Sequence, residues 1–472
     1  FGSMLYLQAR VVGFGRVSGI VAEKILKQAM QKYTNTMIPD QFTLPPIQSF
    51  GHRVIPSLVQ ALQDQSTRVR AAACRALGVL GDPQTIPSLT QMLQDRDFST
   101  CAEACQALGM IGDPRAIPDV MQVMHRHYMT TNSSSVFFAA CKTLADLGNP
   151  ELAFEPLIRV MRYSKWLRGQ ARTVLGVVAN PQITPKLIEM LQSKNDYDRW
   201  AACEALRVAP DSAALPYLLQ ALQDKNPYVR YSAAAALGQI RAPEAVNRLS
   251  QLLIEDENFW VRRAACWALG MIGNPQAIPY LARGLQDVHM DVRHDAAVSL
   301  GRIGSPSAIP HLATALQDPV ASVRAAACFA LCTIGSQQAI PLLKQALKDW
   351  RVDVLVQALR ALVALRDPQT IAELPQYISH PSNYVRAAAC EALGTTGEPQ
   401  AAPYLIQALQ DTSWWVRRAA CQALGKIGDP QAIPCLIEVL KSGPSWDQIL
   451  IRNDAWDALW QISIRHKVPI RA

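Results

Sequence analysis

A short stretch of the sequence concentrates imidazole and carboxylate side chains. His289, His294 and His311 lie within 23 residues, although the chain has only eight histidines. Asp291 and Asp295 are four residues apart, so a helix places both on one face with His294 beside them. Imidazole changes its charge near neutral pH, and a positioned His or Asp can transfer a proton. We therefore predict Asp295, His294 and Asp291 as catalytic residues, with exposed polar decoration as the alternative.

A column of aromatic residues recurs two positions before a recurring arginine. In a repeat that stacks in register, these side chains would line one rim beside guanidinium groups. Aromatic rings give rigid contact area, and arginine binds carboxylates through two parallel hydrogen bonds. We predict a ligand-binding stripe, and packing over the turn between helices is the alternative. The column holds Trp166, Tyr197, Tyr228, Trp260, Tyr384 and Trp415.

A second candidate surface is a position that varies strongly between repeats. The second helix of such a unit usually lines the concave surface, so variable residues there can select a partner, and we expect the inner groove to bind it. The position holds Arg75, Gln106, Lys142, Glu204, Trp267, Phe329, Arg360, Glu391, Gln422 and Asp457. From both surfaces, the predicted ligand-binding residues are Trp166, Tyr197, Tyr228, Trp260, Trp267, Arg262, Arg263, Arg293 and Glu204.

Signatures of self-contained catalysis and of metal binding are missing from the sequence. It has no Ser-His-Asp order, phosphate-binding glycine loop or His-x-x-x-His motif. The eleven cysteines form no Cys-x-x-Cys, which argues against a zinc ribbon. Eight share one column, where a buried thiol packs as a small apolar side chain. We predict no metal site and no tightly bound cofactor. The column holds Cys74, Cys105, Cys141, Cys203, Cys266, Cys328, Cys390 and Cys421.

One repeated unit must position all of these residues. Thirteen units follow one another, most of them 31 residues apart. In the first unit, Ile55, Leu58 and Leu62 form an apolar stripe on one helical face, and a second stripe runs from Val69 to Leu80. Neither helix can bury its stripe alone, so stacked units must share a core. The sequence predicts an all-α fold, a right-handed α-solenoid of about thirteen helix pairs.

An Arg column and an Asp column accompany the repeat. Each Asp lies six residues before an Arg, at the end of the first helix. We predict that Asp caps the second helix and pairs with an Arg of its own or a neighbouring unit, which makes a structural ladder. Function is then expected where the ladder breaks, at Cys101, Phe137 and Leu355. The arginines are Arg70, Arg168, Arg199, Arg230, Arg262, Arg293, Arg324, Arg386 and Arg417, and the aspartates are Asp64, Asp224, Asp256, Asp287, Asp318 and Asp411.

Three segments depart from the repeat. Residues 1–50 contain a Gly-Ser remnant of cloning, a helical cap and a linker, and residues 51–440 are the solenoid. Residues 441–472 are expected to form C-terminal capping helices. About seven extra residues within 125–135 form a polar loop, which is either functional or neutral drift. Tryptophans replace small repeat residues in the C-terminal segment at Trp446, Trp456 and Trp460.

Composition and charge narrow the classes of function. Lys and Arg number 46 against 38 Asp and Glu in 472 residues, and this net charge of +8 gives no support for a nucleic-acid-binding protein. No apolar run approaches the roughly 18 residues that cross a bilayer. The first residues lack the plan of a signal peptide, and unpaired cysteines fit a reducing compartment. We expect a cytoplasmic protein without nucleic-acid or membrane partners.

The repeat V-R-x-A-A-x-x-A-L-G-x-I-G-D-P-x-A-I-P-x-L is almost complete from Val261 to Leu281 and from Val416 to Leu436. It resembles the short HEAT-like repeat of phycobilisome lyases. The resemblance implies a bilin lyase or lyase-isomerase, which attaches a linear tetrapyrrole, its substrate, to a cysteine of a phycobiliprotein subunit. A carboxylic acid would protonate the bilin, and arginines would hold its propionates. The alternative is a non-catalytic scaffold, or an assembly or turnover factor, that binds a protein partner in its concave groove.

Deoxyhypusine hydroxylase is another branch that carries this repeat. That enzyme places His-Glu pairs just after the Val-Arg of several second helices, where they bind two irons. This sequence has one comparable place, Val292 to Asp295, with Asp in the position of Glu, and it has no His-Glu dipeptide. A di-iron site needs several such pairs, so we do not predict one.

Overall fold

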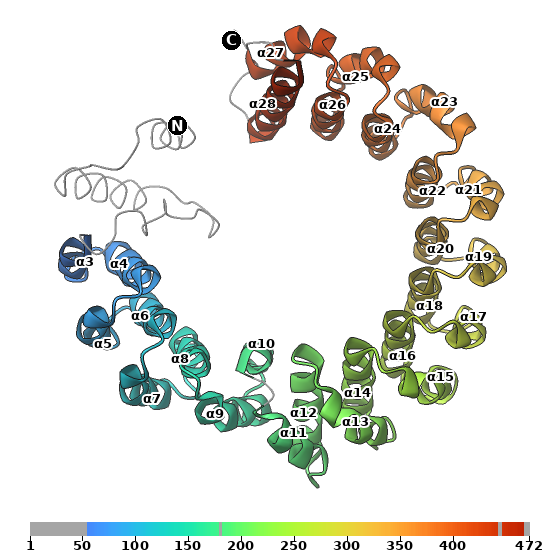
Figure 1. Ribbon diagram of the computed structural model, residues 1–472. Helices are drawn as coiled ribbons and strands as arrows, with labels where there is room; N and C mark the ends of the chain where they lie inside the picture. The colour runs from blue at the N-terminus through green and yellow to red at the C-terminus, as the bar shows by residue number, and fades with distance from the viewer. Residues whose placement is uncertain (1–53, 179–181, 442–445, 467–472) are drawn as a thin grey trace. The chain divides into compact units, whose positions relative to one another are not determined.

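A computed structural model describes residues 54–178, 182–441 and 446–466. Every regular element in these ranges is an α-helix or a short 3-10 turn. The chain forms two compact units, with the boundary between Ala221 and Leu222. In each unit the helices lie in two layers, as Figure 1 shows. The predicted all-α solenoid of helix pairs is confirmed.

The first unit alternates first and second helices of the repeat. Its first helices are α3 (Ile55–Ala61), α5 (Ile86–Met92), α7 (Ile117–Arg126), α9 (Pro150–Tyr163), α11 (Thr184–Leu191) and α13 (Leu215–Ala221). Its second helices are α4 (Thr67–Leu80), α6 (Phe98–Ile111), α8 (Ser134–Asp146), α10 (Arg168–Val178) and α12 (Asp196–Val208).

The second unit continues the same alternation. Its second helices are α14 (Pro227–Ile240), α16 (Phe259–Ile272), α18 (Met290–Ile303), α20 (Ala321–Ile334), α22 (Val352–Ala364), α24 (Asn383–Thr396), α26 (Trp414–Ile427) and α28 (Trp446–His466). Its first helices are α15 (Val246–Glu255), α17 (Ile278–Gly284), α19 (Ile309–Ala315), α21 (Ile340–Ala346), α23 (Pro368–Tyr377), α25 (Ala402–Ala408) and α27 (Ile433–Lys441).

Local signals in the sequence set the ends of these helices. Gly81 follows α4 with a φ of 70°, a left-handed conformation that other residues rarely adopt. The Asp82 side chain then accepts a hydrogen bond from the Gln84 amide at 2.9 Å, and Pro83 opens a 3-10 turn that leads into α5. The predicted glycine stop and Asp-Pro start of the next unit are therefore confirmed, with the 3-10 turn as an additional element.

The second helices pack closely because small residues face one another. A Cβ placed on Gly301 of α18 would lie only 2.6 Å from the Cα of Ala330 on α20. The cysteine column lies in the same interface, and Cys74 and Cys266 are fully buried. Burial raises the pKa of the Cys74 thiol to about 12. The column is a packing feature, as its small side chains predict.

The C-terminal segment contains one long helix. On α28, Ile451, Leu459 and Ile462 are buried against α26 and α27. Trp456 and Trp460 are about half exposed, so the aliphatic side chains supply the packing and these tryptophans face outward. The predicted N-terminal cap and linker lie outside the described residues. The described residues contain no helix with the length and hydropathy of a membrane span.

Candidate functional site

The Arg and Asp columns form the predicted ladder, in which six arginines pair with the Asp of the next repeat. Arg293 Nε and Nη2 lie 2.7 and 3.0 Å from the two carboxylate oxygens of Asp318. Arg293 Nη1 donates to the Asp287 carbonyl in its own repeat at 2.9 Å. Arg262 and Arg293, which we predicted to bind ligand, are thus framework residues whose forks are occupied. Matching pairs are Arg70–Asp95, Arg230–Asp256, Arg262–Asp287, Arg324–Asp349 and Arg386–Asp411.

The predicted catalytic residues lie together near the start of α18. Asp295 accepts a hydrogen bond from Arg263 Nε at 2.8 Å, and its other oxygen lies 3.0 Å from His294 Nδ1. Arg263 Nη1 lies 3.8 Å from an oxygen of Asp291. The Arg263 guanidinium also lies 4.9 Å from the ring centre of Trp260. One arginine of α16 therefore links both predicted carboxylates with a predicted aromatic residue.

The surroundings of Asp295 keep its carboxyl group ionised. Burial raises the pKa of Asp295, but hydrogen bonds from His294 and Arg263 and their positive charges outweigh it, and the net pKa lies below its usual value. A general acid near neutral pH needs a pKa shifted in the opposite direction. This geometry favours an ion pair between α16 and α18 as the role of Asp295.

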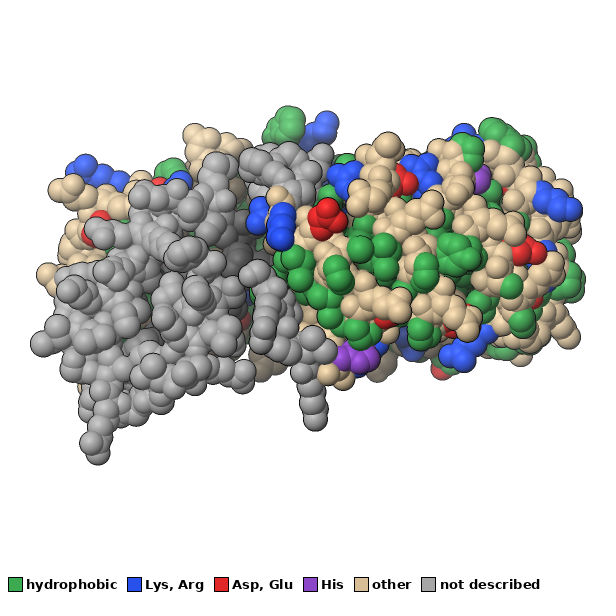
Figure 2. All heavy atoms as spheres, turned by 90° about the horizontal axis from the view of Figure 1, so that it is seen from above, with side chains coloured by type: hydrophobic (Ala, Val, Ile, Leu, Met, Phe, Trp, Pro, Cys, Tyr) green, Lys and Arg blue, Asp and Glu red, His purple; other side chains and the backbone are tan. Residues whose placement is uncertain are grey.

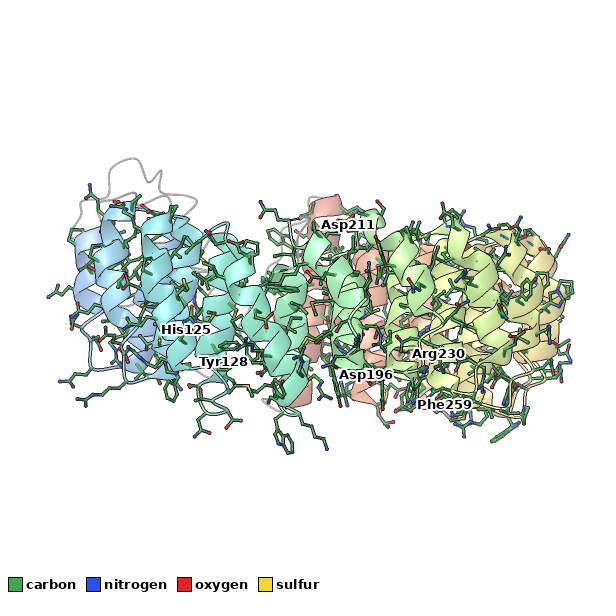
Figure 3. All side chains as sticks on the ribbon, turned by 90° about the horizontal axis from the view of Figure 1, so that it is seen from below. His125, Tyr128, Asp196, Asp211, Arg230 and Phe259 are labelled. Atoms are coloured by element: carbon green, nitrogen blue, oxygen red, sulfur yellow. The ribbon has the colours of Figure 1, made fainter. Side chains whose placement is uncertain are left out.

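The two remaining histidines of the predicted group occupy different places. His289 precedes α18 and stacks on Phe259, with ring centres 3.8 Å apart. Its Nδ1 accepts a hydrogen bond from the Asp291 amide at 3.3 Å, which caps the helix. Figure 3 shows Phe259 and Arg230 at the edge of the second unit where second helices begin. His311 lies exposed on α19, a first helix, and is therefore separated from the group.

The aromatic column is exposed at the starts of the second helices. Exposure of its six side chains ranges from 43% at Trp415 to 85% at Trp166. This exposure favours a surface role over packing across the turn. Trp166 and Tyr197 belong to the first unit, whereas Tyr228 and Trp260 belong to the second.

Two other predicted ligand-binding residues contribute to packing. Glu204 on α12 is 2% exposed, and its carboxylate lies 3.1 Å from Arg207 and 3.6 Å from Arg172. Trp267 on α16 is half-buried and packs against Gly238 of α14. Glu204 belongs to the first unit and Trp267 to the second.

The polar insertion within 125–135 is held by contacts of its own. His127 Nδ1 lies 2.8 Å from the Ser133 hydroxyl. The ring of Phe98 on α6 packs edge-on against His127, and Tyr128 packs against an aromatic ring of α8. Figure 3 shows Tyr128 at one edge of the first unit. These contacts fasten the insertion to α6 and α8 and indicate a structural role.

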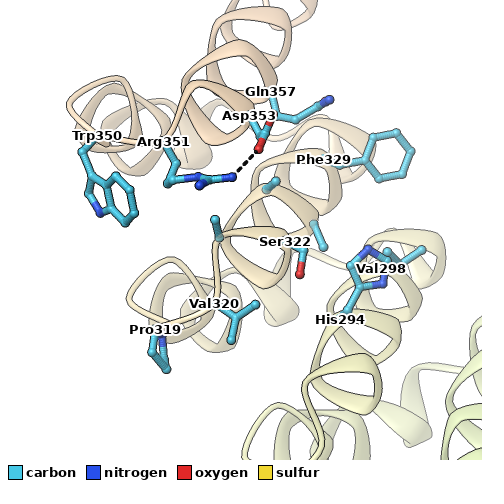
Figure 4. A pocket seen from close by; sticks show the side chains of 13 residues that line it. His294, Val298, Pro319, Val320, Ser322, Phe329, Trp350, Arg351, Asp353 and Gln357 are labelled. Carbon is cyan, nitrogen blue, oxygen red and sulfur yellow. Dashed lines mark hydrogen bonds and ion pairs between the residues drawn. The ribbon is translucent and has the colours of Figure 1, made fainter.

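An open groove of about 700 Å³ crosses three second helices of the second unit. Its walls come from α18, α20 and α22 and from the loops before α20 and α22. Figure 4 shows Phe329 and His294 on one side of the groove and Trp350 on the other. Phe329 is 51% and Trp350 80% exposed, and Arg351 and Asp353 form an ion pair at 3.1 Å between them. The apolar lining is completed by Val298, Val320, Ala325 and Ala326.

Departures from the repeat coincide with the groove. Where α18 has Gly301, α20 has Cys332 and α22 has Val363. A side chain in that position forces neighbouring helices apart, because even a Cβ on Gly301 would collide with Ala330. Within the groove, the contact between α20 and α22 is less extensive than the contact between α18 and α20. Leu355 on α22 also replaces the ladder Arg, so the groove adjoins one of the predicted breaks.

The aromatic column is interrupted in the same three repeats. Asp291, Ser322 and Asp353 occupy its position, and the exposed aromatic surface comes from Phe329 and Trp350. Phe329 was predicted only as a variable residue, and Trp350 was not predicted because it lies in a loop outside the columns. The available signal was the coincidence of three column breaks within three consecutive repeats.

Charged side chains of both signs are mixed on the described surface. Figure 2 shows this mixture on one face, where Lys and Arg are scattered among apolar and acidic side chains. Several charges on second helices are paired across repeats, as in Arg75 with Glu103 and Arg360 with Glu391, each at 2.7 Å. In the part of the chain that the structure describes, no three His, Cys, Asp or Glu side chains are grouped to hold a metal ion.

The stacked helix pairs and their shared ladder define an all-α solenoid protein. A family model of HEAT repeats matches residues 55–128, 184–265, 246–327, 313–378 and 371–453. The chain belongs to the HEAT repeat family.

Solved structures similar to this chain come from several kinds of protein. Kap95p bound to RanGDP is 13% identical, with 96% of this chain and 83% of that chain covered and a TM-score of 0.48. The complex of CpcE and CpcF of phycocyanin lyase from Nostoc sp. PCC7120 is 25% identical, with 52% and 94% covered and a TM-score of 0.33. Human deoxyhypusine hydroxylase with glycerol is 21% identical, with 74% and 98% covered and a TM-score of 0.26. No curated protein sequence matches the chain.

Proposed function

We propose that this HEAT repeat protein is a non-catalytic scaffold that binds a protein partner through the groove over α18, α20 and α22. One observation carries the proposal. Phe329 and Trp350 expose aromatic surface in an open groove, and the charged pair Arg351 and Asp353 lies between them. Exposed aromatic side chains in a concave site are typical anchors of protein interfaces.

The rings of Phe329 and Trp350 leave apolar surface in contact with water. Covering roughly 200 Å² of exposed ring at about 25 cal/mol per Å² contributes about 5 kcal/mol to binding. The paired charges on this face need no compensating charge from the ligand, so an apolar segment of a partner fits the groove. The sidewalls are helices whose backbone groups are already bonded, and recognition must therefore come from side chains.

Site-specific photocrosslinking tests this proposal. A photoreactive phenylalanine analogue is placed at Gln357 in the groove, and a matched one at Tyr404, an exposed residue of the first helix α25. We expect one protein to be captured from the groove position and not from the control position. Its purified form should bind Trp350→Ser and Phe329→Ser at least tenfold more weakly than the unmodified chain, and Tyr404→Ser equally well. Equal binding by all variants would refute the groove as the binding site.

We propose bilin attachment as a second candidate function. The repeat resembles that of phycobilisome lyases, and a groove of about 700 Å³ is of the size that holds small organic ligands. In this role Arg351 and His294 at the groove would contact a linear tetrapyrrole, and a phycobiliprotein subunit would supply the acceptor cysteine. Asp295 is ionised in the free protein, so it would have to take up a proton before it could protonate the bilin.

Spectroscopy separates the two functions. If the protein is a lyase, biliverdin or a phycobilin mixed with it shifts its visible absorption, and co-expression with phycobiliprotein subunits increases thioether attachment. Trp350→Ser should weaken both effects, with Tyr404→Ser as the matched control. If neither effect occurs with any phycobilin, the lyase function is excluded and the scaffold remains.

A further inference from the structure

The ladder usually loses both of its members at a break. An Arg pairs with an Asp 25 or 26 residues later, and at three breaks neither the Arg nor the Asp is present. Arg168 is different, because it is retained although Ser193 stands 25 residues later in the place of the Asp. At these three breaks the Arg position holds Cys101, Phe137 or Leu355. The corresponding Asp position holds Arg126, Arg162 or His380.

The guanidinium of Arg168 is turned away from the ladder. Its Nε donates to the Met161 carbonyl at 3.0 Å, whereas the Nε of the paired arginines binds an Asp. The guanidinium carbon lies 5.7 Å from the ring centre of Tyr197 and 5.6 Å from that of Trp200. Among the residues that the structure describes, none accepts a hydrogen bond from Arg168 Nη1 or Nη2. Two rings therefore hold a planar cation whose outer edge is free.

Asp198, an acidic residue close in the sequence to the missing ladder position, already has partners. Asp198 accepts a hydrogen bond from the Ser193 hydroxyl at 3.0 Å and is paired with Arg162. Ser193 therefore directs its hydroxyl to Asp198 and cannot substitute for the absent carboxylate. Arg168 is left without an acid from its own chain among the described residues.

We propose that Arg168, Tyr197 and Trp200 form a binding site for an acidic side chain of a protein partner. A planar guanidinium edge matches both oxygens of a carboxylate, and flanking rings fix its orientation in advance. The partner carboxylate would accept hydrogen bonds from Arg168 Nη1 and Nη2, because Nε is bonded to the Met161 carbonyl. This site lies on α10 and α12 of the first unit and is independent of the groove.

Exposure indicates that the carboxylate belongs to a larger ligand. Trp166, two residues before Arg168, is 85% exposed, and Tyr197 is 46% exposed. An ion pair on such an open surface is too weak to retain a small acid on its own. A peptide whose acidic residue adjoins apolar side chains gains further contact area on Trp166 and Tyr197, and this combination is the ligand that the surface fits.

Peptide selection tests the proposal with the full chain. A phage-displayed library of random twelve-residue peptides is selected on the unmodified protein and on Arg168→Gln. We expect peptides with Asp or Glu next to an apolar residue to be enriched only on the unmodified protein. The selected peptide, labelled for fluorescence anisotropy, should bind Arg168→Gln at least tenfold more weakly than the unmodified protein. The same peptide with Gln in place of its acidic residue should bind the unmodified protein at least tenfold more weakly than the selected peptide does. Arg159→Gln, which removes an exposed arginine of α9, should bind the peptide normally.

Two further measurements keep the test decisive. Thermal unfolding shows whether Arg168→Gln is folded, and Arg168→Lys retains the charge while it removes the planar fork, so it should also lose at least tenfold in affinity. Selections without acidic residues, or acidic peptides that bind Arg168→Lys and Arg168→Gln normally, would overturn the site. Arg168-dependent binding of biliverdin, a free dicarboxylate, with no binding of acidic peptides would overturn the choice of a protein ligand.

Discussion

Removing Arg324 tests whether the ladder couples neighbouring repeats. Its Nε and Nη2 lie 2.6 and 2.8 Å from the two oxygens of Asp349, and its Nη1 donates to the Asp318 carbonyl at 2.9 Å. The two side chains are 8% and 12% exposed. Arg324→Leu would leave a nearly buried carboxylate with the Arg351 amide as its remaining donor. Stranding a buried charge costs about 3 to 5 kcal/mol, and we expect about 3 because Asp349 keeps some contact with water.

At one break in the ladder, both members of the ion pair are replaced together. One repeat later, Leu355 occupies the position of Arg324, and His380 occupies the position of Asp349. His380 Nδ1 accepts a hydrogen bond from the Ser382 amide at 3.1 Å, as Asp349 does from the Arg351 amide at 2.8 Å. Histidine thus keeps the loop acceptor and leaves no stranded charge. The double variant Arg324→Leu with Asp349→His should therefore cost about 1 kcal/mol, which is about 2 kcal/mol less than Arg324→Leu alone.

Urea unfolding followed by circular dichroism measures the free energy of unfolding for both single variants and the double variant. Because repeats can open locally, hydrogen exchange of the α20 and α22 amides should accompany it. We expect faster exchange in these two helices for Arg324→Leu and recovery in the double variant. If Arg324→Leu costs less than 1 kcal/mol, or if the double variant is as unstable as the single one, the ladder is not a coupling device and the argument fails.

Three further predictions follow from the same contacts. Gly301→Ala should destabilise by about 2 to 3 kcal/mol because its Cβ meets backbone 2.6 Å away, whereas Gly304→Ala, strained only by its φ of 72°, should cost about 1 kcal/mol; equal losses in urea would contradict this. A hydrogen bond from Arg324 holds the pKa of Asp349 below its unfolded value of 3.8, so its contribution is complete above that pH and is lost as the pH falls through the lower folded value; in urea melts from pH 6 to pH 2, Arg324→Leu should lose less stability than the unmodified chain. Iodoacetamide should modify the half-buried Cys332 and Cys435 before the buried cysteine column, as peptide mass spectrometry can show, and equal rates would contradict the packing role.

The helical framework was predictable from the sequence because most repeats have the same apolar stripes and the same Arg and Asp positions. Thirteen copies of the apolar stripes leave one solution for the helices, and the Asp and Arg columns predict their own pairing. Spacing alone did not decide whether Arg pairs within its repeat or with the next one. The structure decides this, because the Arg reaches across the stack to the Asp 25 residues later, as Arg293 does to Asp318.

The candidate site was less predictable, because it depends on what several departures do together. Cys332 and Val363 look like ordinary substitutions until the 2.6 Å approach at Gly301 shows that the position tolerates no side chain at normal helix spacing. Trp350 lies in a loop and joins no column. Conversely, Asp295 had a suggestive neighbourhood, but the position of Arg263 on the preceding second helix makes it a paired carboxylate. The distance between Arg263 and Asp295, which lie on neighbouring second helices, is what decides the role of Asp295, and the sequence alone does not give it.

The ladder also bears on how such a chain can change in length. The partner of each paired Arg lies 25 or 26 residues later, so deletion or duplication of a whole 31-residue unit joins an Arg to a new Asp in the same geometry. One extra residue is accommodated, because Arg230 pairs with Asp256 over 26 residues in the same geometry, whereas a longer insertion would separate the Arg from its acid at that joint. The long insertion within 125–135 lies between Cys101 and Phe137, which replace the ladder Arg in two consecutive repeats. The ladder thus acts as a register that admits whole repeats and confines irregular growth to the places where it is interrupted.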